Sequence, residues 1–255
     1  MKPLDAAKWY RHFLANRRNR PEPQWELPVR LRPEIVKKLL PSIQQFQLGD
    51  GGGPASLIAW DAPQYRDSSE ETRILTKLWF EEEREHSRLL GQAVLRLGGK
   101  SIKSHWSFSA FCACRRLIGV RAELQILLLT ELVSTAYYKV LRKNVDDEPL
   151  KAMCSLILRD EAGHVAFHRD RLAAQPRGKG LLWILQFALC GYAAATTLWV
   201  NHGRCLCPLG ARTAEYYQEV SFQIFRFVRH LFRPQATSLA PAFTAPQFGC
   251  SMKPI

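Results

Sequence analysis

Apolar residues recur at helical spacing along most of this chain, whereas few segments alternate apolar and polar residues as strands do. Helices are predicted for the segments that share this pattern: 6–16, 33–48, 68–97, 119–143, 147–174, 181–200 and 211–232. The four longest segments with short or medium connections favour an antiparallel bundle. The pattern therefore predicts an all-α protein built on four long helices, with extra helices at its C-terminal end.

Residues that favour helix ends mark two of these boundaries. Ser68 and Glu71 form a capping box, in which the serine bonds the first turn and the glutamate reaches back. Gly98 is expected to end that helix. Asp147 is the predicted N-cap of the helix that follows a tight turn, and Pro149 lies in its first turn, where a missing N–H costs little.

Composition divides the chain into four parts. A basic arm over residues 1–30 precedes the helical bundle, 31–175. A C-terminal helical extension covers 176–232, and a tail over 233–255, rich in proline and small residues, is predicted to be disordered. Within the bundle the second and third helices are joined by the long connection 98–118.

The segment 181–200 has no charged residue and is long enough to cross a membrane. A buried helix that covers one side of the bundle explains it as well, and that is the preferred interpretation. Residues 1–20 have no apolar stretch typical of a signal peptide. We therefore expect a cytoplasmic protein, with membrane association through 181–200 as the alternative.

The chain is strongly basic, with 36 Lys and Arg against 23 Asp and Glu and a net charge of +13. Such a charge favours acidic partners. The basic residues are scattered and accompany no nucleic-acid motif, so no nucleic-acid partner is expected, while peripheral contact with a membrane stays open. The seven cysteines do not suggest a secreted disulfide framework.

Two copies of a Glu-x-x-His pattern point to metal chemistry. Glu83 and His86 lie on one predicted helix, and Glu161 and His164 lie on another. Residues three apart share a helix face, so each pair can offer one carboxylate and one imidazole to a metal ion. Each pair also interrupts an otherwise apolar stripe, which places the ligands toward the core.

A third helix supplies a matching acid. Glu131 is the only charged residue between Leu124 and Tyr138. An ionised carboxylate on such a face loses several kcal/mol of hydration unless it is paired. A metal ion resolves this cost, as would a buried cation or protonation. Glu83, Glu131 and Glu161 all lie near the middle of their helices, so a bundle would bring them to one level.

These residues resemble the ferritin-like di-iron carboxylate superfamily over about 33–174. The matching pieces are Trp79 to His86, Glu131 with Tyr137 and Tyr138 downstream, and Asp160 to His164. The resemblance is closest to bacterial ferritin-like domain proteins of unassigned reaction, and more distant to acyl-carrier-protein desaturases and related hydroxylases. It implies a ferritin-like four-helix bundle with a long crossover between its second and third helices.

In that superfamily the first and third helices each supply one Glu ligand. The first helix here has no Glu at the position along the bundle that would match the other ligands. Asp50 is the best candidate, with a shorter arm, and the glycines and proline after it are expected to kink or end the helix. Asp160 resembles an acid that orients a ligand histidine. His168 and Tyr138 are expected around the site rather than on the metal, with His168 half-exposed or near a ligand.

The resemblance implies two iron ions, with manganese or a mixed iron and manganese pair as alternatives. It implies an O2-dependent oxidoreductase that hydroxylates, desaturates or N-oxygenates an organic substrate, with an external electron donor. One alternative is a ferroxidase or iron-binding protein without an organic substrate. Another is a membrane-associated or scaffold protein with a degenerate metal site.

Overall fold

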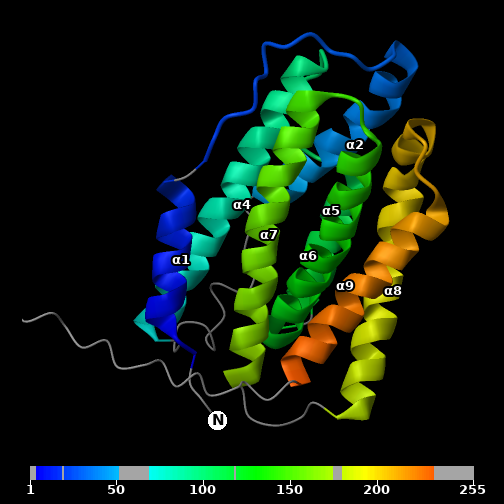
Figure 1. Ribbon diagram of the computed structural model, residues 1–255. Coiled ribbons are helices and arrows are strands. Elements are labelled where there is room, and N and C mark those ends of the chain that lie inside the picture. The colour runs from blue at the N-terminus through cyan, green and yellow to red at the C-terminus, as the bar shows by residue number, and fades with distance from the viewer. Residues whose placement is uncertain (1–3, 19, 52–68, 118, 175–179, 233–255) are drawn as a thin grey trace, which may run out of the picture.

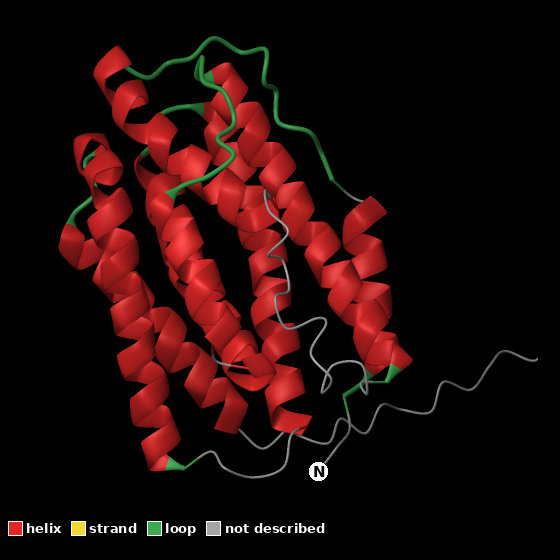
Figure 2. Cartoon of the chain, turned by 180° about the vertical axis from the view of Figure 1, so that it is seen from behind, coloured by secondary structure: helices red, strands yellow, loops and turns green. Residues whose placement is uncertain are grey.

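The computed structural model describes residues 4–18, 20–51, 69–117, 119–174 and 180–232. Within them the fold is helical throughout and has no strand (Figure 2), which confirms the all-α prediction. The elements are α1 (Ala6–Arg18), α2 (Pro33–Gly51), α4 (Glu70–Arg96), α5 (Trp106–Leu117), α6 (Gly119–Asn144), α7 (Glu148–Ala174), α8 (Leu181–Leu206), the 3-10 turn η2 (Cys207–Leu209) and α9 (Thr213–Phe232). The predicted disordered tail, 233–255, lies outside the described residues.

Four long helices enclose the core. Helix α2 packs along α4, α6 packs along α7, and α4 contacts α7. A hydrogen bond of 2.7 Å between the hydroxyls of Ser42 and Tyr137 joins α2 to α6. Helix α1 lies against α4 and α7 at one flank, whereas α8 and α9 cover α6 at the opposite flank (Figure 1).

The helix ends agree closely with the capping signals. The backbone N–H of Leu150 donates to Asp147 Oδ1 (3.3 Å), so Asp147 is the N-cap that was predicted. At the start of α4 the cap is Ser69, which accepts from the N–H of Thr72 (3.3 Å), one residue later than predicted, because Ser69 has the extended backbone of a cap. Gly98, with φ of 77°, follows the end of α4.

The connection between α4 and α6 is mostly helical. Helix α5 occupies its second half, so the stretch expected to be a long crossover is a loop followed by a helix. A buried ion pair between Arg115 of α5 and Glu123 of α6 (2.6 Å) fixes the two helices together.

The N-terminal arm is part of the packed structure. Helix α1 buries Trp9 and Phe13. The Phe13 ring lies 5.6 Å from that of Phe167 on α7. The arm that composition suggested therefore forms an additional layer beside the site.

The preferred interpretation of 181–200 as a buried helix is wrong. Two described helices are long and apolar enough to cross a membrane, 122–144 in α6 and 181–209 around α8. The most apolar window of the first is 61% buried, but that of the second is only 17% buried. Helix α8 packs inward through Phe187, Gly191 and Ala195, and its opposite face remains exposed because no described element covers it.

Candidate metal centre

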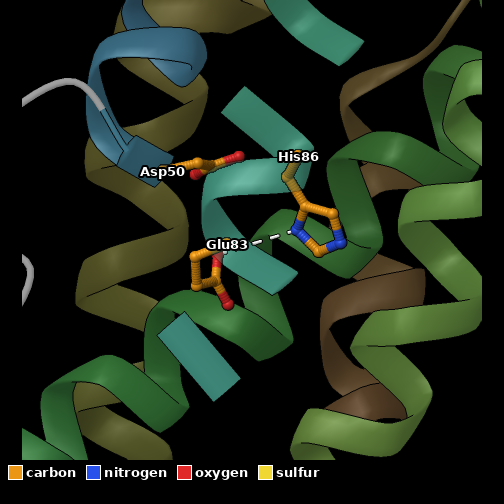
Figure 3. Close-up of side chains that lie close together, drawn as sticks. All are labelled: Asp50, Glu83 and His86. Atoms are coloured by element: carbon orange, nitrogen blue, oxygen red, sulfur yellow. Dashed lines mark ion pairs between the residues drawn. The ribbon is translucent and has the colours of Figure 1, made fainter. Parts of the chain in front are cut away.

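The six predicted ligands come together from four helices. They are Asp50 in the last turn of α2, Glu83 and His86 in α4, Glu131 in α6, and Glu161 and His164 in α7. Ligand atoms of Asp50, Glu83 and His86 all lie within 4.8 Å of one another, as do those of Glu83, Glu161 and His164. Figure 3 shows the first group, in which Asp50 faces the pair from α4. Glu83 belongs to both groups, so the geometry offers two adjacent sites.

Three contacts surround the Glu83 carboxylate. The indole N–H of Trp79, one turn earlier on α4, donates to Glu83 Oε1 over 3.0 Å. The same oxygen lies 3.0 Å from His164 Nδ1, and Oε2 lies 3.6 Å from His86 Nδ1. One carboxylate oxygen is thus turned toward each histidine.

The His86 ring has one nitrogen facing inward and one facing outward. Nδ1 lies 3.6 Å from Glu83 and 3.8 Å from Glu161. Nε2 lies 3.3 Å from Asp160 Oδ2. Because an ionised carboxylate only accepts, Nε2 carries the proton in this bond, which directs the Nδ1 lone pair inward in the neutral ring. Asp160 therefore does orient a histidine, as the sequence predicted.

His164 repeats the arrangement from the opposite helix. Its Nδ1 faces Glu83 at 3.0 Å, Glu131 at 3.6 Å and Glu161 at 3.8 Å. Its Nε2 lies 2.9 Å from Glu82 Oε2. Each histidine is thus bonded by the acid that precedes the glutamate of the other helix. The contacts of the two motifs therefore have approximately the same pattern when α4 and α7 are exchanged.

Three inward atoms make no hydrogen bond, although carboxylate oxygens lie close to them. His86 Nδ1, His164 Nδ1 and Glu161 Oε2 are buried and make no hydrogen bond. An unsatisfied buried group of this kind costs about 1–3 kcal/mol. Three of them aimed at one point fit a metal centre, since metal ions would take these lone pairs.

Charges inside the site shift several pKa values. Burial opposes protonation of His86, but the bond to Asp160 and the nearby Glu83 raise its pKa to about 9. Burial likewise opposes protonation of His164, yet Glu83 and Glu131 raise its pKa. Burial raises the pKa of Glu83, but the positive histidines outweigh it and lower the pKa. Without a metal ion, these shifts favour the protonated form of both histidines and the ionised form of Glu83.

Asp50 and Glu161 lie close to other carboxylates, which disfavours their ionisation. Burial, then the charge of Glu83, raises the pKa of Asp50. Burial, then the charge of Glu131, raises the pKa of Glu161. A divalent cation would offset this repulsion and allow both carboxyl groups to ionise.

A glycine allows Asp50 to reach the site. A Cβ at Gly51 would lie 2.8 Å from Ser87 Cβ and 3.2 Å from Arg84 Cα. Only glycine therefore fits where the end of α2 meets α4. Asp50 is half-buried. The glycines and proline at 52–54, where a kink or break of the helix is expected, lie outside the described residues.

Sequence reasoning missed two residues that support the histidines. Glu82 is buried and, like Asp160, directly precedes a Glu-x-x-His motif, a repeat visible in the sequence. Arg20 lies between these two acids. It is 2.7 Å from Asp160 Oδ2 and 3.5 Å from Glu82 Oε1. No local pattern distinguishes Arg20 from the other arginines of the basic arm.

His168 and Tyr138 lie near the site without joining it. His168 is fully buried, contrary to the half-exposed expectation, and its ring packs edge-on against Trp79 with centroids 4.5 Å apart. Arg171 contacts its Nδ1 at 3.0 Å. Tyr138 is also buried, and its hydroxyl makes no hydrogen bond. Burial, then the charge of Asp50, raises its pKa.

A cleft of about 530 Å³ opens between α1 and α4, beside Glu82, the acid that contacts His164 Nε2. Its lining includes Glu82 and Arg20, so it reaches the Nε2 side of His164 rather than the inward side. The charged residues around it are Arg17, Arg20, Arg84, Arg88, Glu81, Glu82 and Glu85.

No protein-family model matches this sequence, and no curated protein matches it significantly. Any function proposed for the chain therefore rests on the chemistry of the site itself.

Proposed function

We propose that this chain is a di-iron carboxylate protein of the ferritin-like type, and that it catalyses O2-dependent oxidation of an organic substrate. The observation that carries the proposal is the pair of buried Nδ1 atoms of His86 and His164, which make no hydrogen bond and face one group of carboxylates. Two Glu-x-x-His helices with one further acid from each of two other helices is the ligand set of bundle di-metal proteins.

The two clusters suggest how the residues would share the metals. Asp50 and His86 would hold one iron, and Glu131 and His164 would hold the other. Glu83 belongs to both clusters and would lie between the metals. Glu161, which faces both Nδ1 atoms, would serve both as well. Carboxylates with imidazoles suit iron, and they suit manganese also.

When bound, a pair of ferrous ions supplies the two electrons that reduce O2. The residues around the site would orient the ligands and restrict the access of water. Asp160 and Glu82 bond the two Nε2 atoms and so fix the rotation of each ligand ring. The Trp79 and Phe13 rings lie 6.2 and 6.4 Å from the His164 ring and limit the access of water to it.

The cleft lined by Glu82 and Arg20, on the Nε2 side of His164, offers a place where an organic substrate could bind near the site. Its volume lies in the range of small-molecule sites. Its lining carries the arginines Arg17, Arg20, Arg84 and Arg88 together with the glutamates Glu81, Glu82 and Glu85, so it offers paired charges to a polar organic molecule.

The test is to load the full chain with ferrous iron without oxygen and then mix it with O2. We expect about two irons per chain, an O2-dependent absorbance change, and continued O2 consumption only with an electron donor and a suitable substrate. The double variant His86→Ala, His164→Ala should abolish all three, whereas His105→Ala, before α5, should leave them unchanged. Folded wild-type protein that binds no iron, or whose iron does not respond to O2, would refute the proposal.

A further inference from the structure

The outward face of α8 carries a row of exposed apolar side chains, most of them in its first half. Leu182, Leu185, Leu189 and Val200 are 83%, 57%, 72% and 68% exposed, respectively. Their spacing places them on one side of the helix, opposite the buried Gly191 and Ala195. We call these four residues the α8 stripe. Large exposed side chains aligned in this way mark a binding surface rather than scattered surface residues.

This face has no charge over most of its length. Between Leu181 and Gly203 the helix contains no Asp, Glu, Lys or Arg. At a rise of 1.5 Å per residue this corresponds to about 34 Å. The exposed hydroxyls of Thr196 and Thr197 donate to carbonyls of their own helix, over 2.9 and 3.0 Å. These side chains therefore remain hydrogen-bonded when water is removed.

Helix α9 extends the apolar surface. It lies antiparallel to α8, because the Trp183 and Phe232 rings approach to 6.3 Å while Tyr216 at the other end stacks on Trp199 at 5.1 Å. Phe225 is 65% exposed and Phe232 is 44% exposed. Both belong to the end of α9 that lies beside the first turns of α8.

Arginines border the surface at both ends. Arg204 and Arg212 lie at the α8–α9 turn, and Arg226 and Arg229 lie near the end of α9. All four are exposed, and none has an acidic partner within 4.0 Å among the residues that the structure describes. The acids of α9 are used elsewhere: Glu215 and Glu219 pair with lysines of α6.

We propose that this α8–α9 surface docks the protein on an anionic lipid bilayer, with the arginines at the headgroups and the α8 stripe against the acyl chains. An apolar face bordered by unpaired arginines is the chemistry that anionic bilayers bind. A second copy of the chain fits less well, because an isologous contact would bring these arginines together in a protein of net charge +13.

The same residues indicate that α8 lies in the membrane surface and does not cross it. Helix α9 packs along α8 and contains Arg226, Arg229 and Glu219. Carrying these charges through the hydrocarbon would be costly. A helix that lies in the interface keeps its arginines at the phosphates while the leucines enter the acyl region.

The test measures co-sedimentation of the full chain with vesicles of phosphatidylcholine, alone or with one quarter phosphatidylglycerol. We expect binding to the anionic vesicles. The triple variant Leu182→Gln, Leu185→Gln, Leu189→Gln should weaken it at least about tenfold. Arg226→Glu with Arg229→Glu should weaken binding to anionic vesicles only. The control is Leu95→Gln on α4, which is 60% exposed in the wild type and should leave binding unchanged. Circular dichroism checks that each variant is folded.

Three results would overturn the proposal. One is no binding of folded wild-type protein to anionic vesicles. Another is full binding by the triple leucine variant, which would mean that net charge alone attracts the protein. The last is a concentration-dependent dimer in light scattering that the triple variant abolishes without any vesicle binding, which would assign the surface to a second copy.

Discussion

The rings of His86 and His164 lie 5.6 Å apart between centroids, tilted by 38° to one another. They come from antiparallel helices, yet each turns Nδ1 to the same carboxylates and Nε2 to an acid of the opposite helix. A single buried histidine on an apolar face is commonly a packing residue. Two that repeat one pattern of partners, with both inward atoms unsatisfied, are better explained by a shared ligand.

Glu83 should be the residue on which both metal positions depend, because its carboxylate belongs to both ligand clusters. Replacement of Glu83 by Gln should reduce bound iron from about two per chain to below one. The measurement is elemental analysis after loading without oxygen and removal of free iron. Glu85→Gln is the matched control, because Glu85 pairs with Arg88 at the surface. Equal iron in the Glu83 variant and the wild type would exclude a shared carboxylate.

Arg20 should stabilise the fold because it forms ion pairs with both Asp160 and Glu82. Replacing Arg20 by Met leaves Asp160 and Glu82 close together without their common cation. Breaking a buried pair of this kind costs about 3 kcal/mol, which urea unfolding of the metal-free protein would measure. Arg17→Met is the control, because the Arg17 side chain is 70% exposed and its ion pair should contribute less than about 1 kcal/mol. Similar losses in the two variants would contradict the role given to Arg20.

Gly51 should be needed for the approach of α2 to α4. In Gly51→Ala the new methyl group meets backbone of α4, so the end of α2 must move and carry Asp50 away from Glu83. We expect weaker binding of one iron and a loss of about 1–3 kcal/mol in the free energy of unfolding. Gly49→Ala in the same helix meets nothing within 4 Å and should be neutral or slightly stabilising. Iron titration of the two variants separates these outcomes.

His202 should make the fold sensitive to acid. Burial, then the positive charge of His105, lowers its pKa to about 4. The unfolded chain binds a proton near pH 6.5 and the folded chain does not, so stability is full above that pH and falls as the pH drops toward 4. At 1.36 kcal/mol per pH unit the loss is up to about 3 kcal/mol. The unfolding free energy of His202→Gln should fall less over this range, and a fall as large as that of the wild type would contradict the assignment.

The sequence predicted the long helices and the residues that gather at the candidate site, because both depend on local spacing. Glu83, His86, Glu161 and His164 could be paired because residues three apart share a helix face. The role of Arg20 could not be foreseen, since it depends on how the chain folds back after α1. Glu82 was within reach, because it repeats the position of Asp160.

The placement of α8 could not be predicted for a different reason. An uncharged helix has the same sequence pattern whether it is buried in protein, in lipid, or on one side only. Composition measures how apolar the segment is, but not how many neighbours cover it. In the structure α2, α6 and α9 cover only one side of α8.

Two metal ions should bind between α4 and α7, with Glu83 between them. A crystal structure of the iron-loaded chain, with anomalous diffraction recorded at the iron absorption edge, would locate them. We expect two iron peaks about 4 Å apart, one beside His86 Nδ1 and one beside His164 Nδ1. A single peak at the protein surface, or ligand side chains that keep only each other as partners in iron-saturated crystals, would contradict this expectation.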